Sequence, residues 1–451
     1  MEQFVNREAE IGLIDRAFGE LLDKEHLLRT PIIDFYGVEG IGKSSILKQV
    51  RQKCDKWNVR YVDANMSQGF ADFWQKISTF SQKKYSQSPV QHEIKVLVAQ
   101  STEIAKELLE QQAPLVMLLD GVDATNESHV EHLEKFLAEL VLYNNLFVIL
   151  TSRRSVSFER KKSLQLTTIL VHVQPLDRDD SHTYLKSLGH SLSEETQDLI
   201  FEWTRGYPLA MNVMVEAIAK QGIDPTNGEG KKRLISLIIE RVIDQGILVN
   251  VAKDEHPMFH ALLGVLAVPR RFNLLMMQQL IEHFAPQWKL ASDLAYIPLS
   301  RKITKDTGIF GWDMTKAGLA VDHSVRNILL LQLKITHPES YVEINRFLAE
   351  ANWQKATSDE VRGTDRIHYQ REYLYHSAIN TADEQLAAFL QTTIEQMIMD
   401  FQKNSDQLMQ FREEFLQDHE LRDVLGKHAA NVITLLDQAL TPKLDDKAAE
   451  G

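Results

Sequence analysis

The residues best suited to chemistry form a glycine-rich run near the N-terminus that ends in a lysine and a serine. The run fits the pattern G-x-x-x-x-G-K-[ST] at every fixed position: Gly37-Val38-Glu39-Gly40-Ile41-Gly42-Lys43-Ser44. Glycines let the backbone curl so that successive N–H groups face one phosphate group. The lysine then reaches the β- and γ-phosphates, and the serine hydroxyl ligates Mg²⁺. The sequence therefore predicts a nucleotide site with Mg²⁺, and Ser45 is expected near the α-phosphate.

Two aspartates after a second apolar run could complete this site. The run at 115–119 ends at Asp120, and Asp123 lies three residues further on. Because parallel sheets bind ligands at the carboxyl ends of their strands, Asp120 is expected to hold Mg²⁺ through its water shell. We expect Asp123 to orient or deprotonate an attacking water. The alternative is that Asp123 caps a helix that starts near Thr125.

Short apolar runs alternate with helical patterns over the first third of the chain, and these elements must position the site. Strands are expected at 31–36, 59–62, 115–119, 146–150 and 166–173, and helices at 8–28, 43–56, 67–80, 90–111 and 127–143. Strands separated by helices of this length form βαβ units with a parallel sheet covered on both faces. We therefore predict an α/β P-loop NTPase core over residues 1–174.

The rest of the chain has mostly helical periodicity. Its clearest linker signal is the segment 224–230, Asp-Pro-Thr-Asn-Gly-Glu-Gly, and short extended pieces between 308 and 321 predict a β-wing. These patterns predict a helical (lid) domain at 175–223 and a winged-helix domain at 231–340. An all-α C-terminal helical region at 341–442 and a flexible tail at 443–451 are expected to follow.

Composition limits the classes of function. Apolar residues make up 44% and charged residues 25% of the 451, which is typical of globular proteins. The single cysteine, Cys54, excludes an internal disulfide framework and a cysteine-based zinc cluster. No run reaches the roughly 18 apolar residues of a membrane span, and the N-terminus lacks a signal peptide, so we expect a cytoplasmic protein. The net charge of −13 disfavours a nucleic-acid partner.

In this arrangement the chain resembles a STAND-type signal-transduction ATPase, related to NB-ARC and NACHT NTPases and more distantly to AAA+ proteins. The resemblance covers about residues 4–335. Besides the P-loop, four segments carry it: Phe4-Val5-Asn6-Arg7-Glu8, Asp120-Gly121-Val122-Asp123, Phe147-Val148-Ile149-Leu150-Thr151-Ser152-Arg153 and Gly206-Tyr207-Pro208-Leu209-Ala210. It implies ATP and ADP as ligands, adenine contacts from Val5, and a structural or nucleotide-proximal Arg7. It also implies that Arg153 senses the γ-phosphate and that Pro208 packs on the base or sugar.

Three positions depart from the family pattern. Asn6 replaces the usual glycine of the N-terminal segment. The segment 321–326 lies where the family carries M-H-D-L-V-R, whose histidine contacts the β-phosphate of ADP, but here the order is Asp322-His323. His323 is therefore expected either to bind the nucleotide from a shifted register or to be a structural, helix-capping histidine. Ala124 replaces the acid that often follows in NACHT proteins, so we expect slow hydrolysis.

The resemblance implies a signalling or defence switch that is closed with ADP and opens and self-associates with ATP. Because no effector domain is recognised before Phe4, the helices at about 340–442 are the candidate binding region for an unknown protein partner. Two alternatives remain. One is a non-hydrolysing ADP-binding scaffold. The other is a DNA-linked AAA+-like ATPase, against which the acidic balance argues.

Overall fold

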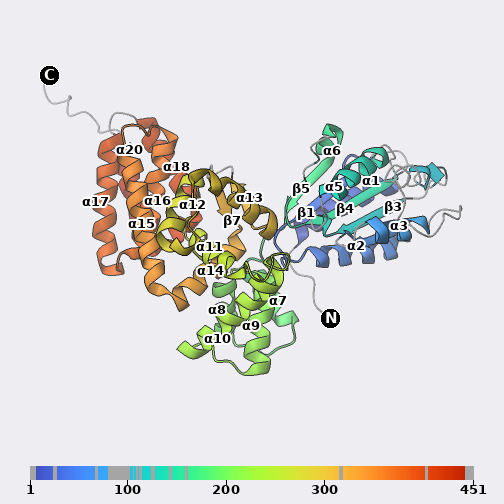
Figure 1. The fold of residues 1–451 in the computed structure, drawn as a ribbon, viewed down its shortest axis with the longest axis horizontal. Coiled ribbons are helices and arrows are strands. Elements are labelled where there is room, and N and C mark those ends of the chain that lie inside the picture. The colour runs from blue at the N-terminus through green and yellow to red at the C-terminus, as the bar shows by residue number, and fades with distance from the viewer. Residues whose placement is uncertain are drawn as a thin grey trace, which may run out of the picture. The chain divides into compact units, whose positions relative to one another are not determined.

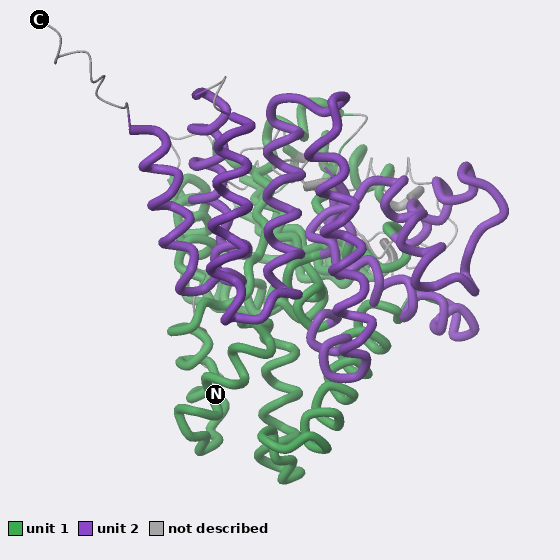
Figure 2. The backbone as a smooth tube through the Cα atoms, turned by 90° about the vertical axis from the view of Figure 1, so that its left-hand side faces the viewer, with its two compact units in different colours: residues 1–251, 304–309, 322–328 green, residues 252–303, 310–321, 329–451 purple. Residues whose placement is uncertain are grey.

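The computed structural model describes residues 7–23, 28–66, 70–79, 102–104, 106–107, 110, 114–122, 127–141, 145–156, 158, 161–313, 318–401 and 405–441. These residues fall into two compact units, which Figure 2 colours separately. Unit 1 comprises residues 1–251, 304–309 and 322–328, and unit 2 comprises 252–303, 310–321 and 329–451. Each unit is described below by itself.

A five-stranded parallel sheet is the centre of unit 1, in the order β2-β3-β4-β1-β5. Its strands are β1 (Ile32–Tyr36), β2 (Arg60–Asn65), β3 (Leu115–Asp120), β4 (Leu146–Ser152) and β5 (Thr168–His172). β4 therefore lies between β1, which leads into the glycine-rich run, and β3, which ends at Asp120. This order brings the carboxyl ends of three functional strands side by side.

Helices cover both faces of the sheet, as Figure 1 shows. They are α1 (Glu8–Leu22), α2 (Lys43–Trp57), α3 (Phe70–Ser78), α5 (Glu127–Leu140) and α6 (Lys162–Thr167). Because successive strand residues point to opposite faces, Met117 and Val148 pack in one cluster with Phe73 of α3. Phe147 points the other way, and its ring lies 5.8 Å from that of Phe18 on α1. With both faces buried, the strands are nearly continuous apolar runs.

The rest of unit 1 is helical. It contains α7 (Arg178–Ser187), α8 (Glu194–Thr204), α9 (Pro208–Gln221), α10 (Gly228–Ile238) and a π-helical segment (Ile239–Ile247). Side chains start several of these helices, as Asp177 does for α7 by accepting from the Asp180 N–H at 2.9 Å. Pro208 is the first residue of α9, where the lack of an N–H costs nothing.

Unit 2 combines a small hairpin with a helical bundle. Its helices are α11 (His256–Leu266), α12 (Leu274–Phe284), α13 (Tyr296–Thr307), α14 (His323–Thr336), α15 (Pro338–Thr357), α16 (Thr364–Asn380), α17 (Asp383–Phe401), α18 (Ser405–Gln417), α19 (His419–Leu425) and α20 (Ala429–Leu440), of which α13 and α14 each have one end in unit 1. The hairpin pairs β6 (Phe310–Asp313) with β7 (Gly318–Val321) in antiparallel register, and Leu319 also bridges to Phe272. A continuous apolar core joins α16 to α20. No helix of the described residues is long and apolar enough to cross a bilayer.

The structure confirms the predicted class, a parallel P-loop NTPase-like sheet followed by a mostly helical region, and it contains the expected hairpin after residue 308. The winged-helix assignment and the five domain boundaries stay predictions. The predicted helix at 90–111 lies largely, and the tail at 443–451 wholly, outside the described residues.

Three local predictions were wrong. The helix expected at 8–28 ends at Leu22, and Asp23 is already extended. The last strand begins at Thr168 rather than Leu166, because α6 runs to Thr167. The predicted linker at 224–230 is only half a loop, because the Asn227 side chain accepts from the Gly230 N–H at 2.7 Å and starts α10 at Gly228.

Candidate functional site

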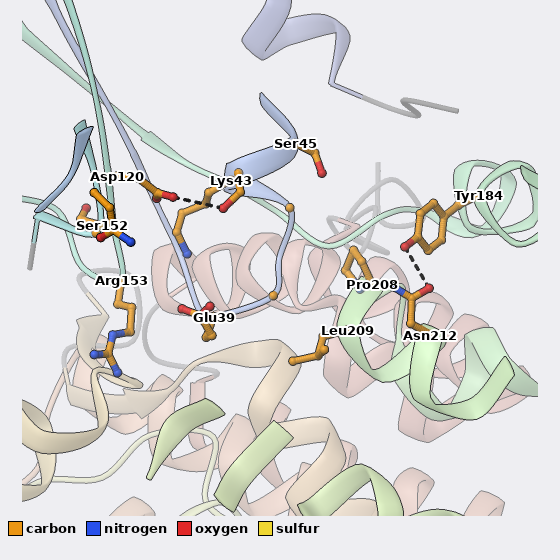
Figure 3. Close-up of a pocket in the computed structure, with 15 residues that line it drawn as sticks. Glu39, Lys43, Ser45, Asp120, Ser152, Arg153, Tyr184, Pro208, Leu209 and Asn212 are labelled. Carbon is orange, nitrogen blue, oxygen red and sulfur yellow. Dashed lines mark hydrogen bonds between the residues drawn. The ribbon is translucent and has the colours of Figure 1, made fainter. Parts of the chain in front are cut away.

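One cavity of about 460 Å³ lies at the carboxyl ends of β1, β3 and β4 in unit 1, and Figure 3 shows it in close-up. It is lined by Glu39, Gly40, Gly42, Lys43, Ser44, Ser45, Asn65, Asp120, Gly121, Ser152, Arg153, Tyr184, Pro208, Leu209 and Asn212. The structure thus brings together residues from three predicted motifs of the site with the N-terminus of α9. The cavity is polar along the sheet ends and apolar where Pro208 and Leu209 approach.

The glycine-rich run forms a tight loop between β1 and α2. The Lys43 ammonium donates to the backbone carbonyls of Gly37 and Val38 at 2.6 and 2.9 Å, so the loop holds this cation at its centre. Gly40 has a φ of +75°, and a Cβ built on it would lie 2.5 Å from the Leu209 side chain. Position 40 therefore requires glycine both for its backbone conformation and for the close approach of α9.

Asp120 ends β3 beside the start of α2. Its Oδ2 accepts from the Ser44 hydroxyl at 3.5 Å, an interaction drawn in Figure 3. Its Oδ1 accepts from the buried Thr151 hydroxyl of β4, which in turn accepts from the Gly121 N–H at 3.2 Å. These contacts orient the carboxylate toward the loop. Ser44 and Asp120 supply two hard oxygen ligands, which fits Mg²⁺, an ion bound by one or two side chains together with phosphate oxygens and water.

A buried aspartate clamps the segment that carries Arg153. Asp34 in the middle of β1 accepts from the Ser152 hydroxyl at 2.8 Å and from the Val156 N–H at 2.7 Å. Both ends of the segment 152–156 are therefore tied to one fully buried carboxylate. This arrangement fixes where β4 ends and directs Arg153 to the cavity that it lines.

The turn before α9 packs directly on the loop. A Cβ built on Gly206, whose φ is +76°, would lie 1.8 Å from the carbonyl oxygen of Leu176, so only glycine fits there. The next residue, Tyr207, is fully buried and donates its hydroxyl to the backbone carbonyl of Glu39. Burial raises the pKa of Tyr207, and Asp322 and Glu39 act in the same direction, so the hydroxyl stays protonated as a donor.

Asp322, rather than His323, is the inward-facing residue at the start of α14. Its Oδ1 accepts from the Ser324 and Val325 N–H groups at 3.0 and 3.4 Å and so caps the helix, while its Oδ2 lies 3.9 Å from the His172 ring. Burial raises the pKa of Asp322, opposed by these N–H groups and by His172. His323 is exposed, contacts Asn327 at 3.1 Å, and is not among the residues that line the cavity.

Three further predicted residues have different outcomes. Arg7 is buried and donates to the backbone carbonyl of Ile41 at 2.9 Å, so it supports the loop from behind rather than lining the cavity. Burial lowers the pKa of Arg7, with Glu10 acting against it. Val5 and Asp123 lie outside the described residues.

Sequence reasoning missed one group of cavity residues, shown at the right of Figure 3. The Tyr184 hydroxyl of α7 donates to Asn212 of α9 at 3.0 Å, and both line the cavity. Asn212 lies four residues after Pro208, on the same helix face, so helical spacing from the Pro208 motif could have found it. Asn65 is paired in register with Asp120, and its place at the end of a strand was the available signal.

Comparison with known proteins gives one domain match. The model of the NACHT domain matches residues 32–191, which span β1 to α7 and include the P-loop, Asp120 and Arg153. No curated protein matches the chain.

Several solved structures are similar at low identity. The chain is 13% identical to Cdc6p from Pyrobaculum aerophilum, with a TM-score of 0.40, covering 75% of this chain and 96% of that one. It is 13% identical to a STAND protein with a tetratricopeptide-repeat sensor from Pyrococcus horikoshii, with a TM-score of 0.36, covering 99% of this chain and 59% of that one. It is 12% identical to the Orc1 protein of Aeropyrum pernix, solved in complex with DNA, with a TM-score of 0.41 and coverages of 73% and 93%. Similarities this low carry no functional argument, whereas the NACHT match includes the P-loop and the sheet ends that line the cavity, and α9 lies beyond it.

Proposed function

We propose that this chain, whose residues 32–191 form a NACHT domain, is a STAND-type molecular switch that binds ATP and ADP and hydrolyses ATP slowly. One observation carries the proposal. A single cavity is lined by Lys43 and Ser44 of the P-loop, by Asp120 and Arg153 from the two strands beside it, and by Pro208. A nucleotide in that cavity would touch the sheet ends and α9 at once.

The chain's own residues divide the work of binding. The backbone N–H groups of the P-loop and the Lys43 ammonium would hold the β- and γ-phosphates. Ser44 and Asp120 would hold Mg²⁺, which would neutralise charge on the phosphates. Ser45 lies on the cavity wall one residue into α2, near the expected α-phosphate, and Pro208 supplies an apolar surface for the sugar or base.

The switch follows from the contacts between α9 and the P-loop. Tyr207 donates to the Glu39 carbonyl, and Leu209 packs on Gly40. A change in the conformation of the loop would therefore alter the contacts at the start of α9. Arg153 lines the same cavity and would bind the γ-phosphate, a contact that hydrolysis removes. ADP would favour the closed state, and ATP would favour an open state that self-associates.

Hydrolysis would be slow, because Ala124 stands where many NACHT proteins carry an acid. Asp123 would orient the attacking water, and the proposed setting is cytoplasmic signalling or defence with a protein partner on the C-terminal helices. The same alanine favours one alternative, a scaffold that binds ADP without turnover. Steady-state phosphate release after removal of bound ADP distinguishes the two, since a scaffold gives none above background.

A DNA-linked ATPase is disfavoured by α14, the candidate recognition helix. The only arginine in its first ten residues, Arg326, has 3% of its surface exposed and cannot reach a groove. Groove reading needs several exposed basic and polar side chains, and phosphate contacts need positive charge. The net charge of −13 works against both.

Light scattering after size-exclusion chromatography tests the switch. The wild-type chain should be smaller with ADP and larger with a slowly hydrolysed ATP analogue. Arg153→Ala should lose the analogue-dependent increase in mass while keeping its ADP affinity, because the arginine would contact only the γ-phosphate. Arg16→Ala, which removes an exposed arginine of α1, is the matched control and should behave as wild type. Equal loss of ADP and ATP binding in Arg153→Ala would contradict the sensor role.

A further inference from the structure

Two adjacent arginines before α12 have opposite electrostatic environments in unit 2. Arg270 has 2% of its surface exposed and is fully matched by carboxylates. Its Nε and Nη2 donate to the two oxygens of Glu372 at 3.1 and 2.7 Å, its Nη1 donates to Asp418 at 2.6 Å, and its guanidinium lies 4.5 Å from the Tyr375 ring centre. Burial alone would lower the pKa of Arg270, but the two carboxylates raise it instead.

Arg271 has no such partner. Among the described residues its guanidinium makes one hydrogen bond, from Nε to the His368 Nε2 at 2.5 Å, and none to a carboxylate. The carboxylate that acts on it most strongly, Glu372, has both oxygens engaged by Arg270. Burial therefore dominates and lowers the pKa of Arg271 to about 10.

The remaining carboxylates nearby are also engaged. Arg371 donates to Asp418 at 3.1 Å and lies 2.9 Å from Glu414. Arg270 and Arg371 thus pair with Glu372, Asp418 and Glu414. One positive charge, that of Arg271, is left facing an imidazole.

That charge lies at a cavity of about 70 Å³ within unit 2. Its polar lining is Arg271, Asn273, Asn352, His368, Tyr369, Glu372 and His376, and its apolar lining includes Phe272, Met276 and Leu348. A water molecule takes about 30 Å³ of liquid volume, so the cavity has room for about two waters or one small oxyanion.

We propose that this cavity is a binding site for a small free oxyanion, a carboxylate or phosphate group, held by the guanidinium of Arg271. A partly buried cation without a carboxylate is costly, and an anion in the cavity offsets that cost. Because His368 takes the Nε–H, the Nη groups are the donors available for the oxyanion, and a planar guanidinium suits two oxygens at once. The inference does not depend on the nucleotide site.

Binding of inorganic phosphate and of acetate tests the proposal. Calorimetry and the shift in unfolding temperature measure the binding, with ionic strength matched by chloride. The protein is used in two forms: wild type saturated with ADP and Mg²⁺, and the Lys43→Ala chain. In both, the P-loop is removed as a source of phosphate binding. A saturable response to at least one anion is expected in both forms.

Arg271→Gln should weaken that binding about tenfold or more, since a charge-assisted hydrogen bond is lost. Arg271→Lys should retain part of this binding, because lysine keeps the positive charge but lacks the planar guanidinium that can bind two oxygens at once. Arg346→Gln removes an exposed arginine of the same unit and should bind as wild type. In chloride alone, Arg271→Gln should unfold at the wild-type temperature or slightly above. No saturable response to either anion, or equal binding by Arg271→Gln and wild type, overturns the proposal. A response that appears in nucleotide-free wild type but in neither of these two forms also overturns it, because the anion would then occupy the P-loop.

Discussion

The hydroxyl of Tyr207 offers a specific test of how α9 holds the P-loop. It is fully buried, stays protonated, and donates to the backbone carbonyl of Glu39, a residue that lines the cavity. Tyr207→Phe removes this one donor and keeps the ring that fills the space. The Glu39 carbonyl is then left without its buried partner.

Losing the partner of a buried carbonyl costs about 1–2 kcal/mol. We expect the free energy of unfolding to fall by this amount in the absence of nucleotide. Because Glu39 belongs to the loop that would cradle the phosphates, a loop released from α9 must be reordered on binding, so ADP affinity should also fall, by a factor of about 5 to 30 if that reordering costs a further ~1–2 kcal/mol. The ring remains, so the variant should fold.

Chemical unfolding and calorimetry with ADP provide the two measurements. Tyr61→Phe is the matched control, because it removes a half-buried phenol hydroxyl of β2 for which the structure shows no hydrogen bond to a described residue. A loss of stability with unchanged ADP affinity would refute the idea that α9 anchors the loop. If neither quantity changes, the contact itself contributes nothing.

Two further predictions concern buried charges. Asp322→Asn keeps a side chain that can cap α14 and removes a buried carboxylate. Burial raises the folded-state pKa of Asp322, so the wild-type protein loses stability as pH rises through that pKa. The variant should therefore have a higher melting temperature than wild type at pH 8, and the difference should disappear as pH approaches 4. A lower melting temperature of the variant at pH 8 would mean that the pair with His172 outweighs burial. Arg270→Leu leaves Glu372 and Asp418 buried without their shared cation and should cost unit 2 about 3–5 kcal/mol, measured by chemical unfolding, and a loss under 1 kcal/mol would contradict the matched network.

The sequence predicted the core well because its signals are local. A glycine-rich run between an apolar strand and a helix indicates a phosphate-binding loop. An apolar run that ends in Asp120 indicates the end of a strand. Parallel pairing then brings both to one edge of the sheet. Even Arg153 was predictable to this extent, since a strand-terminal residue of β4 must emerge at the same edge.

The supports of the site were not predictable from local patterns. Asp34 is a charged residue inside an apolar run, and only the fold shows that it ties down residues 152–156. Gly206 could be assigned to a helix start, but its need for glycine comes from the Leu176 carbonyl, 30 residues earlier. Tyr184 became part of the cavity through packing of α7 on α9, which no spacing rule contains.

Errors arose where one side chain redirects the backbone. The glycines at 228 and 230 were assigned to a linker, yet Asn227 caps a helix that begins there. For His323, the alternative of a helix-capping histidine was wrong, because Asp322 caps α14 and leaves His323 exposed, whereas its role as a nucleotide ligand stays a prediction. In both cases a short polar side chain that bonds to the backbone decided the outcome.

The most direct test of the central claim is the identity and amount of nucleotide released when the purified protein is denatured. Wild type should release about one adenine nucleotide per chain, mainly ADP if the closed state is the stable one. Lys43→Ala should still fold. It should release no nucleotide, because it removes the cation that the Gly37 and Val38 carbonyls hold in the loop. If Lys43→Ala retains the same nucleotide in the same amount, the ligand is bound elsewhere and the assignment of this cavity is wrong.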